Sequence, residues 1–317
     1  MVNKMKIFKL QLPLLSALIT VLFELLVPDS SLHKSADHEY LVWFIVILTT
    51  IYEIVLLVGS RNVRGVLLYK SAFYTAFFQV LNVFNLLTVK LAVLPVLYFP
   101  SLDRIFGVLI SDSAFLGQCL LYTLRIQLSG WLLGVAAGIC TGIAIGFSKR
   151  FRYWCQPLVR VLGPIPPTAW IPIVLVVFPS VIVASSFLIA LAVWFPTTVL
   201  TSNGIANIKN SYFEVASTLG AGKTYSVFKV GIPAAMPFMF IGIFNGTCSS
   251  FITLVTAEML GAKYGIGWYI NWQKEMMSYA NVYAGLIVMS LVCFVVISVL
   301  FKLRDRLLVW QKGVIKW

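Results

Sequence analysis

Long apolar runs alternate with short polar segments along the chain, and this pattern sets the predicted architecture. Eight runs are long enough to cross a bilayer as helices, since each crossing takes about 20 mostly apolar residues. The third run has the least distinct ends, because it contains Asn82, Asn85 and Lys90. The predicted spans are 8–27, 40–59, 74–97, 120–147, 156–178, 181–202, 234–258 and 282–301. The sequence therefore predicts an all-α, polytopic bundle of transmembrane helices.

Composition agrees with a membrane protein. The 317 residues are 60% hydrophobic and only 11% charged, whereas about 25% of the residues in a soluble domain are charged. The first apolar run is long for the hydrophobic part of a signal peptide, and no small-residue cleavage site follows it. We therefore expect it to stay in the protein as a span.

The basic residues are unevenly distributed between the predicted loops. The chain has 24 Lys and Arg against 11 Asp and Glu, a net charge of +13. Cytoplasmic loops of membrane proteins are rich in Lys and Arg, so eight crossings place both termini in the cytoplasm of a bacterial inner membrane. Membrane topology explains the charge without a nucleic-acid partner. Most of the basic residues then lie in cytoplasmic segments: Lys4, Lys6, Lys9; Arg61, Arg64, Lys70; Lys149, Arg150, Arg152; Lys209, Lys223, Lys229; Lys302, Arg304, Arg306, Lys312 and Lys316.

The residue types needed for metal binding or catalysis are sparse. None of the five cysteines forms a CxxC pair, and the two histidines, His33 and His38, share one short polar loop. Neither HExxH nor GxSxG occurs. We expect no metal site, no catalytic residues and no enzymatic activity in this chain.

The fourth predicted span carries a glycine at every fourth position. Such a ladder lies on one helix face and lets another helix approach closely. Two interpretations stay open, tight packing within the subunit or a surface that slides during gating. The glycines are Gly130, Gly134, Gly138, Gly142 and Gly146.

The fifth predicted span is rich in helix-breaking residues. It contains Gly163, Pro164, Pro166, Pro167 and Pro172, and proline removes a backbone donor and interrupts a helix. Irregular backbone at membrane depth persists only where protein or a water-filled cavity lines it. This segment either lines a pathway or forms a kink packed against its neighbours.

The polar segment of about 203–233 is a basic cytoplasmic loop. Asn210 or Ser211 is expected to cap a helix that starts near Tyr212, and Gly220 suits the turn that ends it. A second short helix is predicted from Lys223 to Val230. Residues 220–224 resemble the end of a phosphate-binding loop, but serine stands where that motif needs its first glycine, and no strand precedes it. We expect no ATP site and no cofactor in this chain.

The same loop resembles the cytoplasmic signature of permease subunits of ATP-binding-cassette importers. That signature has Glu-Ala-Ala, three residues, Gly, nine residues and then Ile-x-Leu-Pro. The chain has the same spacing, with Val for Ala, Val for Ile and Ile for Leu at three positions. The matching positions are Glu214, Val215, Ala216, Gly220, Val230, Ile232 and Pro233.

Further motifs resemble one branch of this family, which serves nitrate, sulfonates, taurine, bicarbonate and pyrimidine precursors of thiamine. These motifs are Ile165-Pro166-Pro167 followed by Ile171-Pro172, then Phe195-Pro196, Ala257-Glu258-Met259 and Gly265-Ile266-Gly267. The resemblance covers roughly 99–317 and does not extend to 1–70. Family permeases commonly have six spans, so we expect a two-span extension at 1–70 and the permease domain at 71–317. A further departure is Phe178-Pro179-Ser180, where such permeases often have a glycine-containing turn.

The resemblance implies a transport function that depends on partners. A separate ATPase subunit would bind ATP and drive the loop, a second permease copy would complete the pathway, and an extracytoplasmic binding protein would deliver the solute. A small, anionic solute such as a sulfonate, nitrate or bicarbonate is expected. The alternative is a secondary transporter driven by an ion gradient, which predicts an internal inverted repeat that the sequence does not clearly show.

Polar residues inside the predicted spans are the candidates for the solute pathway. Arg125 suits an anion but can instead extend to the outer interface, and Glu258 can instead make a structural hydrogen bond. The candidates are Arg125, Pro166, Pro167, Ser249, Thr253, Thr256 and Glu258.

Overall fold

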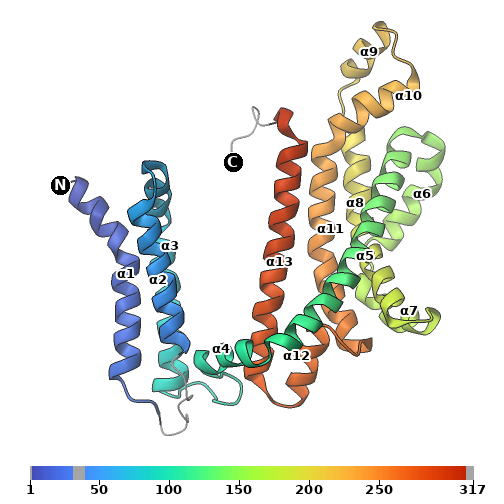
Figure 1. Cartoon of the computed structure of the whole chain (residues 1–317). Coiled ribbons are helices and arrows are strands. Elements are labelled where there is room, and N and C mark those ends of the chain that lie inside the picture. Colours follow the sequence, from blue (N-terminus) through green and yellow to red (C-terminus); the bar gives the residue numbers. More distant parts are fainter. Residues whose placement is uncertain (1, 31–39, 312–317) are drawn as a thin grey trace. The chain divides into compact units, whose positions relative to one another are not determined.

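The computed structural model describes residues 2–30 and 40–311, and this part of the chain is helical with short connections (Figure 1). The histidines at 33 and 38 and the lysines at 312 and 316 lie outside the described residues. Packing divides the chain into two units. Unit 1 comprises Met1–Ala114 and Gln273–Ala284, and unit 2 comprises Phe115–Trp272 and Gly285–Trp317.

Unit 1 is built on three long helices, α1 (Val2–Leu26), α2 (Tyr40–Val58) and α3 (Arg61–Asn85). Side chains of α1 bond to the backbone of α3 in the same order along both helices, so these two helices run parallel. Ser16 donates to the carbonyl of Thr75 and Thr20 to that of Phe78. The α2 helix runs antiparallel to them, and Ala17, Leu41, Ile45 and Phe78 form the apolar core between the three.

The third span differs from the predicted 74–97. The α3 helix begins at Arg61 and continues through a π-helical turn, η1 (Leu86–Lys90), after which the chain turns away from the helix axis. The predicted span lies too far toward the C-terminus for two reasons. The residues after Asn85 are apolar and were included, and the charged residues at the start of α3 were excluded. Lys90 ends the span by pairing with Asp29 at 2.7 Å and with Glu24 at 3.4 Å.

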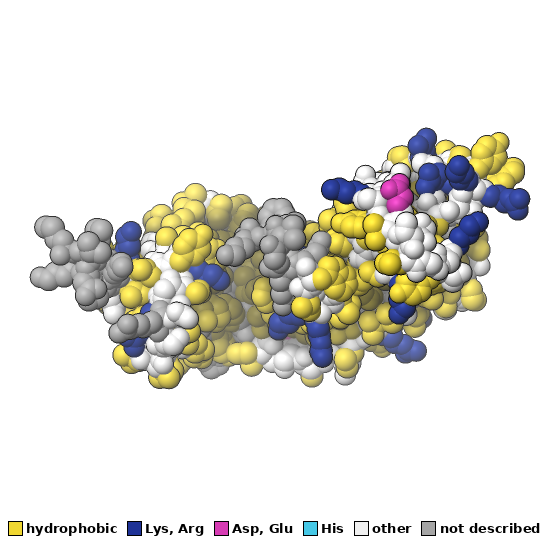
Figure 2. Space-filling model, turned by 90° about the horizontal axis from the view of Figure 1, so that it is seen from above, with side chains coloured by type: hydrophobic (Ala, Val, Ile, Leu, Met, Phe, Trp, Pro, Cys, Tyr) yellow, Lys and Arg dark blue, Asp and Glu magenta, His cyan; other side chains and the backbone are white. Residues whose placement is uncertain are grey.

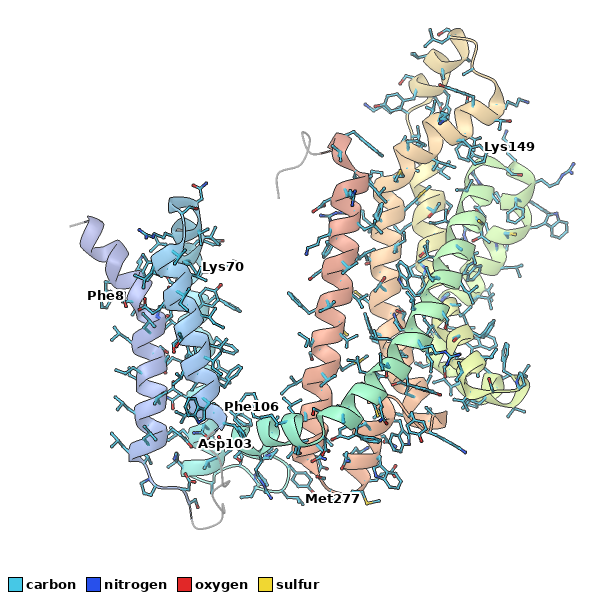
Figure 3. All side chains as sticks on the ribbon, in the orientation of Figure 1. Phe8, Lys70, Asp103, Phe106, Lys149 and Met277 are labelled. Carbon is cyan, nitrogen blue, oxygen red and sulfur yellow. The ribbon has the colours of Figure 1, made fainter. Side chains whose placement is uncertain are left out.

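A short amphipathic helix, α4 (Leu102–Ser111), completes unit 1. Its buried Asp103 accepts a hydrogen bond of 2.8 Å from the backbone N–H of Leu41, at the start of α2. Burial raises the pKa of the Asp103 carboxyl above its ordinary value, although this hydrogen bond opposes the shift. Phe106, labelled with Asp103 in Figure 3, stacks on Phe44 of α2 with ring centroids 4.7 Å apart. The α4 helix is therefore fastened to the beginning of α2.

Unit 2 contains the remaining long helices. In chain order the elements are α5 (Ser113–Phe147), α6 (Lys149–Leu162), η2 (Pro167–Trp170), α7 (Ile171–Val177), α8 (Val181–Ala206), α9 (Asn210–Thr218), α10 (Lys223–Tyr225), η3 (Ser226–Gly231), α11 (Ile232–Gly261), α12 (Ile266–Glu275), α13 (Tyr279–Leu307) and η4 (Val309–Gln311). The α5, α12 and α13 helices each have residues in both units.

The glycine ladder of α5 lies against α8. A Cβ at Gly134 would be 2.6 Å from the carbonyl oxygen of Ala190, and one at Gly142 would be 2.5 Å from the Cβ of Thr201. The residues of α8 under the ladder are also four apart and increase in the same order: Ile189, Val193, Thr197, Thr201 and Ile205. The two helices therefore run parallel, in a contact that we call the glycine seam.

The parallel seam determines how the chain crosses between α5 and α8. Because α8 starts beside the beginning of α5, the connection must return along the full length of the pair. This connection consists of α6 and of η2 with α7, which meet at a bend of 86°. The described residues thus contain seven continuous helices long and apolar enough to cross a membrane, and up to eight spans if the bent pair, which we call the broken span, is counted as one.

The α11 helix closes the unit by running antiparallel to α8. Gly242 lies on Thr197, and Gly246 lies on Val193. Trp131 of α5 donates its indole N–H to Thr247 at 2.8 Å. Three helices thus share one tightly packed centre, and the broken span lies beside it.

Candidate functional site

The predicted cytoplasmic loop forms a compact turn of two helical segments. The α9 helix begins at Asn210, two residues earlier than expected, and Lys209 precedes it without a side-chain cap, so the predicted caps Asn210 and Ser211 are wrong. The predicted second helix is not separate either. The α10 segment covers only Lys223–Tyr225 and continues through the π-helical η3 into α11.

Gly220 ends α9 in a left-handed conformation with a φ of +80°. The N–H of Ala221 bonds to the carbonyl of Ala216 at 2.9 Å, and the N–H of Gly220 bonds to that of Ser217 at 3.0 Å. These two bonds make a Schellman motif, which satisfies carbonyls left free at a helix end. A side chain at position 220 would meet no neighbour, so the need for glycine here is one of backbone conformation alone.

The outer surface of this loop is apolar and basic. Val215 and Leu219 are 60% and 83% exposed, whereas Ala216 points inward and is buried. Glu214 is also exposed. Figure 2 looks onto this end of the helices and shows Lys and Arg side chains spread over unit 2, with apolar side chains between them. An exposed surface that is both apolar and positively charged suits contact with another protein.

The base of the loop is fixed to the end of α5. The ring of Phe213 packs edge-on against Phe147, with centroids 6.3 Å apart. Gly231 lies under the same ring, because a Cβ there would be 2.3 Å from the Phe147 Cζ. Val230 lies in η3, and Ile232 and Pro233 are the first two residues of α11. A displacement of the loop would thus reach both α5 and α11.

The polar candidates in the spans do not form one site. Glu258 is completely buried and accepts from the Thr123 hydroxyl at 2.8 Å and from the Gly267 N–H at 2.8 Å. Thr123 in turn accepts from the N–H of Ile266 at 2.9 Å. Gly265, with a φ of +120°, leaves room for the carboxylate. Glu258 therefore joins α5, α11 and α12 as a structural latch.

Three further candidates lie elsewhere. Arg125 is exposed on α5 and does not line the cavity described below. Thr253 is buried and donates to the Ser249 carbonyl, while the half-buried Thr256 donates to that of Ile252, one turn back in the same helix. These hydroxyls are satisfied by their own helix.

The broken span borders a partly open cavity of about 370 Å³ together with α8 and α11, and two of the predicted residues line it. Pro167 contributes from the bend and Ser249 from α11, and Pro166 directly precedes the lining segment. Asn245, one turn before Ser249, also lines the cavity and was missed by the sequence analysis. Its position in the centre of an apolar helix is the signal that could have identified it.

The position of this cavity is typical of a solute site. It lies at the middle of α8 and α11, where the backbone of the neighbouring span is broken. Transporters often place solutes near the bilayer midplane, at discontinuous helices whose free backbone groups face a cavity. We call it the bend cavity, and it is the candidate solute site of the chain.

Known proteins show two kinds of similarity to this chain. The family model described as binding-protein-dependent transport system inner membrane component matches residues 134–309. The aliphatic sulfonates transport permease protein SsuC of Bacillus subtilis is 33% identical over 58% of this chain and 67% of its own length. The nitrate import permease protein NrtB of Synechococcus elongatus is 31% identical over 62% and 69%.

A solved structure shares the fold. A chain of the MetNI methionine ABC transporter, in an inward facing conformation, aligns with 62% of this chain and 98% of its own length. The TM-score is 0.52 at 16% sequence identity, so the likeness concerns the arrangement of helices only.

Proposed function

The chain belongs to the family of binding-protein-dependent transport system inner membrane components, and from this premise we propose that a separate ATPase subunit drives it through the α9–α10 loop. It is a membrane permease of the ATP-binding-cassette importer class. The family implies two kinds of partner, an ATPase and a substrate-binding protein. In this scheme ATP is bound by the partner and the permease supplies the pathway.

The observation that carries this proposal is the exposed loop held by the Schellman turn at Gly220. Its outward apolar side chains, Val215 and Leu219, fit burial in a cleft of a partner, and Glu214 fits a basic group there. Because Phe213 and Gly231 both contact Phe147, movement of the loop is transmitted to α5 and, through the glycine seam, to α8. The ATP-bound ATPase would bind one of two arrangements of the spans more tightly than the other. It would thereby shift the population toward that arrangement.

The distribution of basic residues supports a cytoplasmic position for the loop. In unit 2, the end that carries the loop also carries the start of α6, where Lys149 is labelled in Figure 3, and the last turns of α13. All of these segments are rich in Lys and Arg, as expected of a cytoplasmic face. We also propose that both termini lie on that side of a bacterial inner membrane, which follows if the bent pair counts as an eighth span.

We further propose that two permease copies form the functional unit and that the solute passes the bend cavity. The sulfonate and nitrate relatives support a small, anionic solute. An extracytoplasmic binding protein would deliver it to the opposite end of unit 2.

The test uses two loop variants in the complete importer. Gly220→Val is expected to lower ATP-dependent uptake by at least about tenfold, since a branched side chain is strained at positive φ. Glu214→Arg should also abolish uptake, by reversing the charge that faces the partner. Both variants should reach the membrane in normal amounts, which immunoblotting of membrane fractions checks.

Gly222→Val is the matched control. Gly222 lies in the same turn with a φ of −70°, and a Cβ there would have no atom within 4 Å, so a side chain fits. Normal uptake by Gly220→Val would overturn the coupling role. Uptake that follows an ion gradient without ATP would favour the secondary transporter.

A further inference from the structure

Four of the thirteen residues that line the bend cavity are aromatic, and most of the others are aliphatic or proline. Trp170 comes from η2, and Phe187, Trp194 and Phe195 come from α8. The polar groups are Asn245 and Ser249 of α11. Among the described residues that line it, none carries a charge. A cavity of about 150 Å³ is enough to bind benzene, so about 370 Å³ accommodates a substituted ring.

The rings are held in place by their surroundings. The indole N–H of Trp194 donates to the Thr141 hydroxyl at 3.1 Å. Phe195 rests on Gly163, where a Cβ would be only 1.9 Å from its ring. Phe187 packs against Phe178 with centroids 5.0 Å apart. A ligand therefore meets a preformed aromatic surface rather than rings that must first be ordered, which lowers the cost of binding.

Asn245 has hydrogen-bonding capacity to spare. Its side chain is exposed in the middle of α11 and bonds to no other described residue. An amide offers two donors and two acceptor sites, and a free amide at this depth in a bilayer marks a functional position. The neighbouring Ser249 adds a hydroxyl one turn away on the same helix face.

We propose that the bend cavity binds a small organic solute through a flat, unsaturated ring, which stacks between Trp170 and the α8 aromatics while Asn245 and Ser249 bond to its polar edge. This inference rests on the proposed function and specifies the solute class. Aromatic pairs favour offset stacking and edge-to-face contacts, which a flat ring can make and an aliphatic solute cannot. Among the small anions of the proposed function, this lining favours one that carries its charge on a ring substituent over a bare oxyanion such as nitrate, which would lose its hydration without gaining a cationic partner in the cavity.

The choice of occupant follows from the polar edge of the cavity. A lipid chain would fill an apolar groove equally well but would leave the Asn245 amide and the Ser249 hydroxyl without partners. A ring solute with a hydrogen-bonding substituent satisfies both surfaces. Neutral and acidic rings differ only in the substituent, and the probes below distinguish them.

The test measures binding to the purified full chain in lipid nanodiscs by saturation-transfer difference NMR. The probes are matched pairs, benzamide with acetamide and benzenesulfonate with methanesulfonate. We expect saturation transfer to the ring protons of benzamide and at most weak transfer to acetamide. Transfer to benzenesulfonate would agree with the anionic solute of the proposed function. Its absence, with transfer to benzamide retained, would restrict the class to neutral rings and reject an anionic solute at this cavity.

Two variants locate the binding. Trp170→Ala and Asn245→Leu should each weaken benzamide binding about two- to tenfold, since a stacking contact or a net hydrogen bond contributes about 0.5–1.5 kcal/mol. Trp154→Ala is the matched control, because Trp154 is exposed on α6 and does not line the cavity. Asn245→Leu changes an exposed side chain of similar size, so it stays informative if Trp170→Ala folds poorly.

Three results would overturn the inference: equal transfer to benzamide and acetamide, no binding by either ring probe, or full binding by both cavity variants. None of them bears on the ATPase, because the assay contains neither ATP nor a partner. Conversely, ring binding together with unimpaired uptake by Gly220→Val would reject the coupling role and leave the cavity assignment intact.

Discussion

The glycine seam and the broken span are two neighbouring ways of crossing the same bilayer. In the seam, regular helices approach so closely that a Cβ on α5 would fall within 3.0 Å of α8. In the broken span, the α6 helix ends at Leu162 and the chain resumes a helical course beyond an 86° bend, beside a cavity of about 370 Å³. Unit 2 thus combines a close-packed pair of helices, α5 and α8, which fixes their relative position, with an irregular segment that leaves room for a ligand.

The largest effect on stability is expected from a bulky residue in the glycine seam. Gly142→Leu should destabilise the protein by about 3 kcal/mol, the upper end of overpacking costs, because the neighbours are the Thr201 Cβ and the Thr198 carbonyl. The yield of monodisperse protein in size-exclusion chromatography and the thermal unfolding midpoint should both fall.

Gly117→Leu is the control for that substitution. Gly117 lies on the same helix, but a Cβ there meets nothing within 4 Å. Equal behaviour of the two variants would show that α5 and α8 can separate at little cost.

The second test asks whether α5 is also held by its polar latch. Glu258→Ala should lower stability by about 2 kcal/mol, because the buried Gly267 N–H and the Thr123 hydroxyl lose their acceptor. Thermal unfolding followed by intrinsic fluorescence measures the loss. Thr256→Val, which removes a hydroxyl bonded only within the same helix, should leave the midpoint unchanged. A stable Glu258→Ala variant would mean that the seam alone fixes α5.

A third test places an extra methyl group at the bend. Gly163→Ala should cost about 1 kcal/mol, less than in the seam, because the obstructing atoms belong to the Phe195 ring and not to backbone. The ring should move into the bend cavity and reduce benzamide binding. Unchanged binding in nanodiscs would show that Phe195 is not part of the binding surface.

The smallest effect on stability is expected inside the cavity. Asn245→Leu should change the free energy of unfolding by no more than about 0.5 kcal/mol, since the side chain is exposed and unpartnered among the described residues. Chemical or thermal unfolding of the purified variant checks this. A large loss of stability would contradict the assignment of Asn245 to a ligand and favour a structural partner.

The sequence was sufficient to predict the all-α fold and about eight spans, because apolar length is a local property. It also predicted the turn at Gly220, where one backbone conformation requires one residue type. The start of α3 was misplaced because Arg61 and Arg64 look like loop residues, although they lie in the first turns of a helix. The caps at Asn210 and Ser211 failed because the helix began at the first of them.

The solute candidates were harder to sort, since pairing across helices is not a local property. Glu258 and Ser249 are nine residues apart, which puts them on opposite faces of α11. The helical period could thus have separated the latch from the cavity. The partner of the glycine ladder could not have been named, because a glycine face accepts any helix with a complementary row.

The parallel arrangement of α5 and α8 also constrains how the protein is made. The ribosome delivers the glycine face of α5 to the bilayer before its partner exists, and the whole broken span must follow before α8 emerges. Until then that face can contact only lipid or the insertion machinery. The packing of α5 against α8 therefore begins only after α8 has been synthesised. A chain arrested after α7 would expose an unpaired glycine face to the quality-control proteases of the membrane.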